Sequence, residues 1–435
     1  MLWNTLVELD FLVSLIFIIV YGLASLRSKT INLADVYFIS SLIPVLLVIG
    51  YHIESCNTTM SLSIELFIAV LTGVVMYSFK NFESILLLLL AFIGNIMMLH
   101  SIDFLTFFIT LEAQNFCFFV LCALMSSKIS SSFNVEAAIK FFVLSAFTSG
   151  VLLYWFSLIY LTTGCTTFSI INNFSLTGNT SHYSYFILCA LLFKLGAAPL
   201  HLWVTQIYTG VKKQLLMYIS TVPKLSLFGF WFSNFNSLIS SSSVLLFSLF
   251  SLILGSFSAY NSPALRSLFA YSTINETGLM LLAVESSGEY SLYQHLGLYI
   301  ISQFLLWNLC DKSFFSIVAI TLAGLPPLAG FFGKAFIFWQ ASTVGLFTTL
   351  LVSLGCTIVS LVYYLRIIRL FWNSSVANNT RFVFFSSNSV INRALILQPT
   401  INLTLLSSRV YLTSLCVILL IFTPIFVIKP FVCFA

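Results

Sequence analysis

Seven ionisable side chains lie inside long apolar stretches of this chain: Glu112, Glu136, Glu276, Lys140, Lys194, Lys224 and Lys334. A lysine at bilayer depth costs about 2.5–3.5 kcal/mol even on a lenient insertion scale, and such residues usually mark ion pathways. Burial disfavours the charged form of a lysine, whereas a nearby carboxylate favours it. A lysine under both influences binds or releases H⁺ when its partner moves a little. These residues therefore predict a proton relay.

Prolines lie close to three of these lysines, in the groups Lys194 with Pro199, Lys224 with Pro223, and Lys334 with Pro326 and Pro327. A proline lacks the backbone N–H that a helix needs, so it opens the helix. Inside a membrane, such a break is tolerated only where it is buried in protein or lines water. We therefore expect interrupted helices at Pro199 and at Pro326–Pro327. His201, close to the first break, is a further relay candidate.

The lysines also have structural interpretations, which the sequence leaves open. Lys194 fits an ion pair with Glu112 that only holds helices together, and Lys224 fits a side chain that reaches toward the helix end. Glu136 and Lys140 are one helical turn apart near the start of an apolar segment. That spacing favours an interfacial pair as much as a pathway role.

Glu276 and the histidines are less informative. Glu276 fits a buried acid with satisfied hydrogen bonds as well as it fits a relay, and His201 fits a polar residue between packed helices. The remaining histidines lie near the ends of predicted spans and indicate little by position: His52, His100, His182 and His295.

The composition places these groups in a membrane protein. Hydrophobic residues make up 60% of the 435 residues and charged residues 7%, and the mean hydropathy is +1.06. A soluble globular domain has about 25% charged residues. We therefore predict an all-α fold, a polytopic membrane helix bundle. The net charge of +5 is small, and no basic stripe indicates binding of nucleic acid.

A spanning helix needs about 20 mainly apolar residues. On that length we predict about fourteen spans, at 6–26, 36–53, 61–79, 82–101, 104–126, 136–162, 184–209, 214–237, 242–261, 265–285, 290–310, 313–340, 343–371 and 410–431. Two connections are long and polar, at 162–183 and 373–409.

The basic residues test this assignment independently. The lysines and arginines between spans all follow odd-numbered spans: Arg27, Lys29, Lys80, Lys128, Lys212, Lys213, Arg266, Lys312, Arg366, Arg369, Arg381, Arg393 and Arg409. Positive charge collects on the cytoplasmic side of a membrane or its equivalent. Both termini are therefore predicted on the opposite face, and a miscounted span would destroy the alternation.

The single transmembrane domain (1–435) divides by topology. We expect three N-terminal helices at 1–79, a first five-helix repeat at 82–237, a second at 242–371, the polar connection 373–409, and the last helix at 410–431. The seventh and twelfth spans are five apart and enter the membrane from opposite sides. Interrupted helices in corresponding places of two halves are typical of inverted-repeat transporters.

No cofactor site is predicted in this chain. The nine cysteines form no CxxC pair and no His/Cys cluster with metal-ligand spacing. No GxxxxGK[ST] or GxGxxG loop indicates nucleotide binding. The N-terminus lacks a basic region before its apolar stretch, so we expect a retained first span rather than a cleaved targeting peptide.

Five motifs together resemble one known family. FKLGAAPLHLW followed by TVPK, LAGLPPLAGFFGK, LRSLFAYSTINETG, VEAAIKFFVLSAFTSGVLL and the glutamate of TLEAQNFCFFVL occur in order between residues 105 and 339. They are similar to subunit 2 of respiratory NADH dehydrogenase (complex I; subunit N in bacteria). The seventh-span motif differs from that of the antiporter-like sister subunits after the histidine. The three N-terminal spans, which some animal members lack, are also present.

The resemblance implies a proton-translocating subunit in the membrane arm of complex I. It places the functional glutamate at Glu112 and the functional lysines at Lys140, Lys194, Lys224 and Lys334. It implies that NADH, FMN, iron–sulfur clusters and ubiquinone are bound by other subunits. The implied partners are antiporter-like subunit 4, small membrane subunits and lipids.

Two departures from the family pattern stand out. Thr209 and Lys212–Lys213 replace an acidic residue and a Pro-rich turn, and Glu276 stands where the family often has histidine. The low charge and the richness in Phe and Ser are typical of organelle-encoded chains. We therefore expect a mitochondrial inner-membrane location, with the basic loops on the matrix side and both termini in the intermembrane space.

The mechanism expected from these residues is a half-channel from the positive side to Lys194, paired with Glu112. A central polar axis would then pass through Lys224 to Lys334 and leave on the opposite side. Redox chemistry in other subunits would move an acidic partner and so change the proton affinity of each lysine. Two alternatives remain open, a stand-alone cation/proton antiporter and a membrane scaffold without transport.

Overall fold

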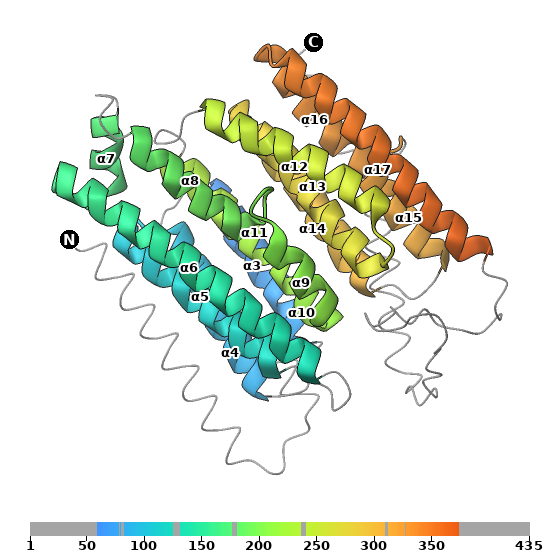
Figure 1. Cartoon of the computed structure of the whole chain (residues 1–435), viewed down its shortest axis with the longest axis horizontal. Coiled ribbons are helices and arrows are strands. Elements are labelled where there is room, and N and C mark those ends of the chain that lie inside the picture. Colours follow the sequence, from blue (N-terminus) through green and yellow to red (C-terminus); the bar gives the residue numbers. More distant parts are fainter. Residues whose placement is uncertain are drawn as a thin grey trace. The chain divides into compact units, whose positions relative to one another are not determined.

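The computed structural model describes residues 59–373 apart from 78, 80–81, 125–130, 176–180, 236–240, 309–311 and 327. The predicted spans 6–26, 36–53 and 410–431 and the connection 373–409 lie wholly or almost wholly outside the described residues. The regular structure within the described ranges is helical, and one isolated bridge joins Asp103 and Thr167. Figure 1 shows the helices in chain order.

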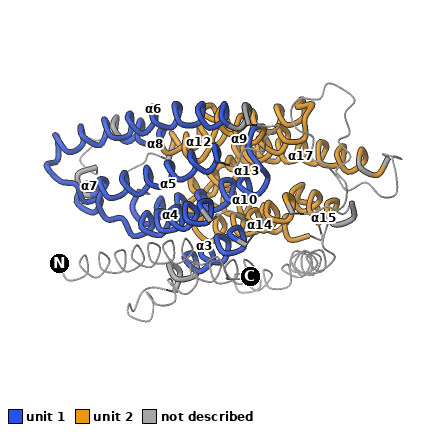
Figure 2. The backbone as a smooth tube through the Cα atoms, turned by 90° about the horizontal axis from the view of Figure 1, so that it is seen from below, with its two compact units in different colours: residues 1–190, 210–239 blue, residues 191–209, 240–435 orange. Residues whose placement is uncertain are grey.

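The chain divides into two compact units, 1–190 with 210–239 and 191–209 with 240–435 (Figure 2). The helices that begin in unit 1 are α3 (Thr59–Tyr77), α4 (Phe82–Leu99), α5 (Phe104–Leu124), α6 (Ser131–Thr163), α7 (Phe168–Ser175), α8 (Ser181–Leu195), α10 (Lys213–Ile219), α11 (Val222–Phe230) and the π-helix η1 (Trp231–Phe235). Those that begin in unit 2 are α9 (Leu202–Gly210), α12 (Ser241–Asn261), α13 (Leu265–Glu285), α14 (Glu289–Asn308), α15 (Lys312–Ala323), α16 (Ala329–Thr343) and α17 (Phe347–Asn373).

The helices follow the predicted apolar segments closely. Five segments are long and apolar enough to cross a membrane by length and composition: 104–124, 135–163, 213–235, 242–261 and 347–370. The predicted span 265–285 coincides with α13, and 290–310 corresponds to α14. The described part of the chain is thus an all-helical, multi-span membrane protein.

The two helix breaks expected at prolines are present. Helix α8 ends at Leu195 and α9 begins at Leu202, with Pro199 between them. Helix α15 ends at Ala323 and α16 begins at Ala329, so the break includes Pro326. Each predicted long span is therefore two shorter helices.

Two elements differ from the sequence prediction. The span predicted at 214–237 is divided into α10, α11 and η1, because Thr221 has a non-helical backbone (φ −122°, ψ −64°) and Pro223 follows it. The polar connection 162–183 contains the short helix α7. Its Phe168 ring packs against Phe107 and Phe230, which fixes this helix within unit 1.

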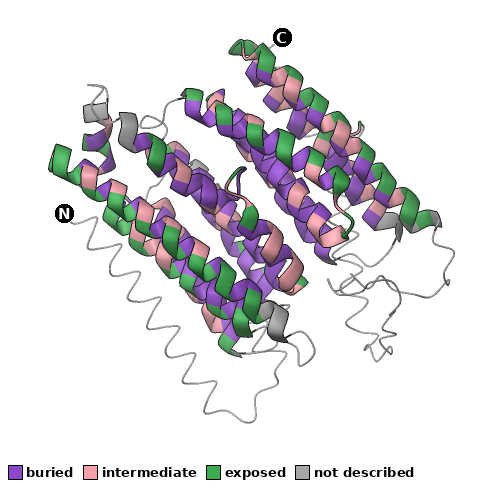
Figure 3. Cartoon of the chain, viewed as in Figure 1, coloured by how far each residue is buried: buried purple, intermediate pink, exposed green. Residues whose placement is uncertain are grey.

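Unit 2 is built around α13, which is buried along most of its length (Figure 3). Two glycines let α12 approach it closely. A methyl group added at Gly255 would lie 2.6 Å from the backbone nitrogen of Asn275, and one at Gly278 would lie 2.5 Å from Ser251 Oγ. Because α12 packs closely on one side of α13, the side chains that contact Glu276 come from other helices.

Candidate functional site

The break between α15 and α16 positions a buried lysine. Gly324 has φ +82°, a backbone conformation that glycine adopts without strain. Gly330 lies so close to the end of α15 that an added methyl group would be 1.8 Å from the carbonyl oxygen of Thr321. The start of α16 is therefore pressed against the carbonyl groups at the end of α15.

One of these carbonyl groups binds Lys334, which lies in the second turn of α16. The Nζ of Lys334 donates to the oxygen of Leu322 at 2.7 Å and lies 3.0 Å from Glu276 Oε1. The side chains of Lys334 and Glu276 are 5% and 2% exposed. The predicted groups Glu276 and Lys334 are thus brought together from different helices, 58 positions apart in the chain (334 − 276).

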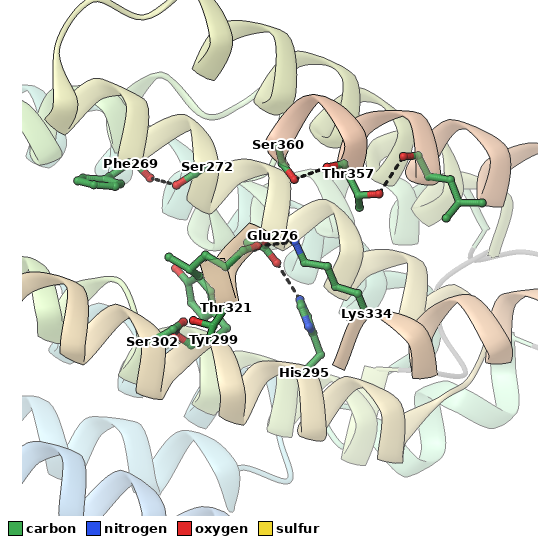
Figure 4. A network of polar contacts seen from close by, with 12 residues as sticks. Phe269, Ser272, Glu276, His295, Tyr299, Ser302, Thr321, Lys334, Thr357 and Ser360 are labelled. Carbon is green, nitrogen blue, oxygen red and sulfur yellow. Dashed lines mark hydrogen bonds and ion pairs between the residues drawn. The ribbon is translucent and has the colours of Figure 1, made fainter. Parts of the chain in front are cut away.

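The second oxygen of Glu276 contacts a histidine from α14. His295 Nε2 lies 3.0 Å from Glu276 Oε2, and the histidine is 4% exposed. Gly333 permits this approach, because an added methyl group there would be 3.1 Å from His295 Nδ1. Glu276, His295 and Lys334, which we call the triad, point toward one another (Figure 4).

A small cavity adjoins the triad. Its volume is about 20 Å³, and it is lined by Glu276, His295, Leu298, Tyr299, Ser302, Thr321, Leu322, Gly330 and Lys334. A cavity of this size with several polar atoms holds about one water molecule. Figure 4 places Tyr299, Ser302 and Thr321 close to Glu276. A buried acid, base and amine therefore share a site large enough for one hydrogen-bonding small molecule.

The charges of the triad are coupled. Glu276 lies within ion-pair distance of both Lys334 and His295, so its charge is balanced while Lys334 is protonated. Breaking a buried ion pair by removing one partner costs about 3–5 kcal/mol. The charge state of one member is thus tied to that of the others.

His295, whose position near a predicted span end indicates little, is buried against Glu276 in the structure. A usable signal was available in the helical spacing of α14, since polar residues recur at 295, 299, 302 and 303. His100 was also judged uninformative, but its Nε2 lies 2.9 Å from Glu65 Oε1, and Glu65 is 1% exposed.

The other candidates in unit 2 lie at the first break. Lys194 is half-buried in the last turn of α8, and His201 is half-buried just before α9. The ring of His201 lies 6.0 Å from that of Tyr271. Trp203 Nε1 donates to the carbonyl oxygen of Phe193 at 2.7 Å, which ties the start of α9 to the end of α8.

The candidates in unit 1 are on separate helices. Glu112 is half-buried on α5 and accepts from Asn115 at 3.0 Å. Lys224 is 8% exposed in the first turn of α11. Lys194 and Glu112 fall in different units, and their pairing stays a prediction.

The helix that carries Lys224 also contributes to a buried hydrogen-bond network in unit 1. Ser226 Oγ donates to Asn95 Oδ1 at 2.7 Å, and Asn95 Nδ2 donates to Tyr218 Oη at 3.2 Å. These residues come from α11, α4 and α10 and hold the divided span against α4.

Glu136 and Lys140 form an ion pair of a different kind. Their contact is 2.6 Å, at the i,i+4 spacing of α6, but the side chains are 55% and 47% exposed. This observation fits the interfacial interpretation and leaves a pathway role untested. No group of three or more His, Cys, Asp or Glu side chains among the described residues is placed to hold a metal ion.

Known proteins resemble this chain over most of its length. The NADH:quinone oxidoreductase/Mrp antiporter transmembrane family matches residues 101–311. NADH-ubiquinone oxidoreductase chain 2 of Chlamydomonas reinhardtii is 45% identical over 430 residues, covering 98% of this chain and 100% of that relative. NADH-quinone oxidoreductase subunit N of Pelagibacter ubique is 31% identical over 367 residues, covering 74% of this chain and 77% of its own length.

A solved structure has the same fold. A chain of respiratory complex I from Thermus thermophilus with bound aureothin has a TM-score of 0.74 at 20% sequence identity. The match covers 95% of this chain and 98% of that chain. At this sequence identity the similarity shows a common arrangement of helices and does not show the chemistry of individual residues.

Proposed function

Because the chain belongs to the family of NADH-ubiquinone oxidoreductase chain 2, a proton-pumping membrane-arm subunit of complex I, we propose that its triad carries protons. The observation on which the proposal rests is the buried contact of Lys334 Nζ with Glu276 Oε1 at 3.0 Å, completed by His295. Ionisable groups of opposite charge at membrane depth are costly and are usually retained for ion movement.

Proton transfer follows from changes in the Glu276–Lys334 pair. While Glu276 is charged and in place, it favours the ammonium form of Lys334. When Glu276 moves away or takes up H⁺, Lys334 loses its counter-charge and releases its own proton to a neighbouring acceptor, His295 or a water. When the carboxylate returns, Lys334 is reprotonated and the site is reset.

The energies are of matching size. Moving one proton against a membrane potential of about 150 mV costs about 3.5 kcal/mol. Disrupting one buried ion pair costs about 3–5 kcal/mol. Making and breaking a single pair of this kind is therefore sufficient to drive or to block one proton transfer. The driving change comes from redox chemistry in other subunits.

The wider relay extends the triad to the other intramembrane groups. We include Lys194 with Glu112, Lys224 and, with less structural support, Lys140 and His201. The inclusion of Lys224 is supported by its burial next to the helix interruption at Thr221. The inclusion of Lys194 is supported by its position in the last turn of α8, directly before the α8–α9 break.

The proposed topology has about fourteen spans, with inverted five-helix repeats at 82–237 and 242–371. Support comes from the interruptions at Pro199 and at Pro326, which lie five spans apart in the predicted count. The three N-terminal helices (1–79), the connection 373–409 and the last helix (410–431) complete the single transmembrane domain. The distribution of basic residues supports basic loops on the matrix side.

The setting follows from family membership. We propose that the chain lies in the mitochondrial inner membrane, as expected for a relative of the algal chain 2. Its partners are antiporter-like subunit 4, small membrane subunits and lipids. It binds no cofactor of its own, and NADH, FMN, iron–sulfur clusters and ubiquinone are held by other subunits.

The test is a lysine replacement in the assembled complex. Lys334→Met removes the titrating amine but keeps a long apolar side chain, and Glu276 keeps His295 as a partner. The complex should therefore still assemble, less stably than the wild type, and proton pumping per NADH oxidised in the assembled complex should be abolished. Pumping is measured in sealed vesicles with a pH-sensitive dye. The matched control is Lys213→Met at the exposed start of α10, which should pump normally. Wild-type pumping by Lys334→Met would refute the relay and favour a scaffold.

A further inference from the structure

A second buried acid–histidine pair lies in unit 1, on helices that the proposed relay does not use. Glu65 Oε1 of α3 lies 2.9 Å from Nε2 of His100, which directly follows α4. The side chain of Glu65 is 1% exposed and that of His100 is 21% exposed. The carboxylate is thus enclosed by protein, while the imidazole can exchange protons with its surroundings.

The burial of Glu65 requires a positive charge beside it. Glu65 is the one acidic or basic residue in the sequence of α3, and it lies just inside the start of the predicted span 61–79. Ile68, Ala69 and Thr72 follow on the same side of the helix and are buried, so this side packs into unit 1. A buried charge is costly unless it is paired. Protonated His100 supplies the counter-charge.

The turn that carries His100 is fixed to the rest of unit 1. Ser101 Oγ donates to the carbonyl oxygen of Met98 at 2.8 Å, and Asn234 Nδ2 of η1 donates to the carbonyl oxygen of Ser101 at 2.9 Å. Asn172 Nδ2 of α7 donates to the carbonyl oxygen of Asn234 at 3.3 Å. Pairing with His100 therefore fastens α3 to a turn that is itself held by η1 and α7.

The position of the pair along the helices assigns it to one side of the membrane. Glu65 lies in the second turn of α3, and His100 follows the last turn of α4. Lys80 lies between the two helices in the sequence, after the other end of α3 and before the other end of α4. Basic residues collect on the matrix side in the proposed topology. The pair therefore lies on the intermembrane-space side, where the proposed function delivers protons.

The neighbouring elements carry few other charges near this end. Helix α3 packs against α4, α10 and α11, and α4 also packs against α5. The other acidic and basic residues of these helices and of the residues next to them are Glu83, Asp103, Glu112, Lys212, Lys213 and Lys224. Glu83, Lys212 and Lys213 are at the matrix-side ends, and Glu112 and Lys224 lie about two turns or more from the intermembrane-space ends. The remaining acid, shortly after the histidine, also favours a protonated imidazole.

The phenols and thiols on the same helices do not compete for protons. They are Tyr77, Tyr218, Cys117 and Cys122. Such groups ordinarily stay neutral below about pH 8. Among the described residues of these elements, His100 is thus the side chain whose ordinary titration range lies close to neutral pH.

We propose that Glu65 and His100 form a proton-binding site that clamps α3 to the first repeat and responds to the acidity of the intermembrane space. While His100 is protonated, it neutralises Glu65 and α3 is held. When the pH rises and His100 releases its proton, the buried carboxylate loses its counter-charge, and α3 loosens so that water reaches it. The clamp is therefore tightest when the compartment that receives protons is most acidic. The site does not involve the triad, and its sidedness rests on the proposed topology.

Hydrogen–deuterium exchange of α3 in the assembled complex, embedded in lipid nanodiscs, measures the clamp. Exchange in the first turns of α3 is compared at about pH 6 and about pH 8. Helix α5 in the same sample corrects for the pH dependence of the chemical exchange rate. We expect wild-type α3 to exchange about tenfold more slowly at the lower pH, the change for a contact worth about 1.4 kcal/mol. Equal protection at both pH values would overturn the proposal.

Four substitutions separate the pair from its neighbours. His100→Gln and Glu65→Gln each remove one titrating partner and should abolish the pH response of α3. The matched control Glu83→Gln, at an exposed position in the first turn of α4, should keep the response, and so should Asp103→Asn. A purely structural contact would change exchange equally at both pH values. A response that persists in His100→Gln, or that Asp103→Asn abolishes as Glu65→Gln does, contradicts the clamp.

A double variant covers single variants that do not assemble. Glu65→Gln combined with His100→Gln removes both members of the pair, and such a replacement is often neutral for stability. This complex should assemble and show no pH response in α3, whereas a preserved response would refute the clamp.

Sealed vesicles that hold the complex in one orientation test the assigned side. A change from about pH 8 to about pH 6 on the intermembrane-space face alone should slow exchange in α3. The same change on the matrix face alone should leave it unaltered, and the reverse result would overturn the assignment to the intermembrane space.

The outcomes are distinct from those for the triad. Lys334→Met should lose pumping and keep the pH response of α3. Normal pumping by Lys334→Met refutes the triad and leaves the clamp, and a missing response in wild-type α3 refutes the clamp and leaves the triad.

Discussion

Two glutamate–lysine pairs in this chain have similar contact distances and different surroundings. Glu276–Lys334 is separated by 3.0 Å with side chains 2% and 5% exposed, and Glu136–Lys140 by 2.6 Å with side chains 55% and 47% exposed. An exposed i,i+4 pair is worth about 0.3–0.5 kcal/mol. Removing one partner of a buried pair costs about 3–5 kcal/mol. The shorter contact is therefore the weaker one.

The difference teaches that burial, not distance, ties one protonation event to another. Glu136 and Lys140 lie one turn apart on α6, so their contact does not depend on the packing of any other helix. Glu276 and Lys334 come from α13 and α16, and their contact depends on the break before α16. A relay needs the second kind of pair, because its partners can be separated by a movement of one helix against another.

The largest expected effect is that of Glu276→Gln. This change leaves the Lys334 ammonium buried without its counter-charge, so we expect a loss of stability of about 3–5 kcal/mol and loss of pumping. The amount of assembled complex on native gels and the pumping rate in vesicles measure the two effects. Glu289→Gln, at an exposed position on α14, is the matched control.

A double variant sharpens this prediction. Glu276→Gln combined with Lys334→Met removes both charges, and replacing both members of a buried pair is often neutral for stability. We expect assembly to return while pumping stays lost. If the double variant assembled no better than Glu276→Gln, the buried pair would not be the source of the instability.

The next effect tests the break that brings the buried pair together. In Gly330→Ala the added methyl group would lie 1.8 Å from the carbonyl oxygen of Thr321, so α15 and α16 must separate. Overpacking of this kind costs about 1–3 kcal/mol, and we expect a lower melting temperature and slower pumping. Gly355→Ala on α17 meets no atom within 4 Å and should behave as the wild type. An unchanged Gly330→Ala complex would contradict the close approach.

The smallest effect is expected at the exposed pair. Lys140→Met removes a contact worth about 0.3–0.5 kcal/mol, so the melting temperature should barely change, and pumping should fall far less than in Lys334→Met. Lys213→Met again serves as the control. Abolished pumping in Lys140→Met would make the exposed pair as important for proton transfer as the buried one and remove the distinction between the two regions.

The sequence predicted features that depend on composition and local chemistry. Apolar length located the helices, and the prolines at 199 and 326 located two breaks. The high cost of charge in an apolar segment identified Glu276 and Lys334 as functional candidates. Each of these signals is contained within one segment of the chain.

What the sequence did not predict depends on which segments meet. His295 was missed because its partner is on another helix, and the pairing of Glu65 with His100 was missed for the same reason. Helix α7 was missed because it has only eight residues, four of them apolar, which is too short a segment to indicate a helix without the aromatic cluster that receives Phe168. The interruption at Thr221 was missed because apolar residues flank Pro223 on both sides and together fit the length of one span, 214–237.

The carbonyl of Leu322 has a consequence for the order of events at the triad. It accepts from Lys334 at 2.7 Å and carries no ionisable proton, so it can accept from the nitrogen in both its ammonium and its neutral amine form, more strongly from the ammonium. The nitrogen atom can therefore stay in one place while its charge changes. A site anchored in this way can exchange a proton without movement of the lysine side chain. A fixed side chain is also less able to carry protons across the membrane in an uncoupled way.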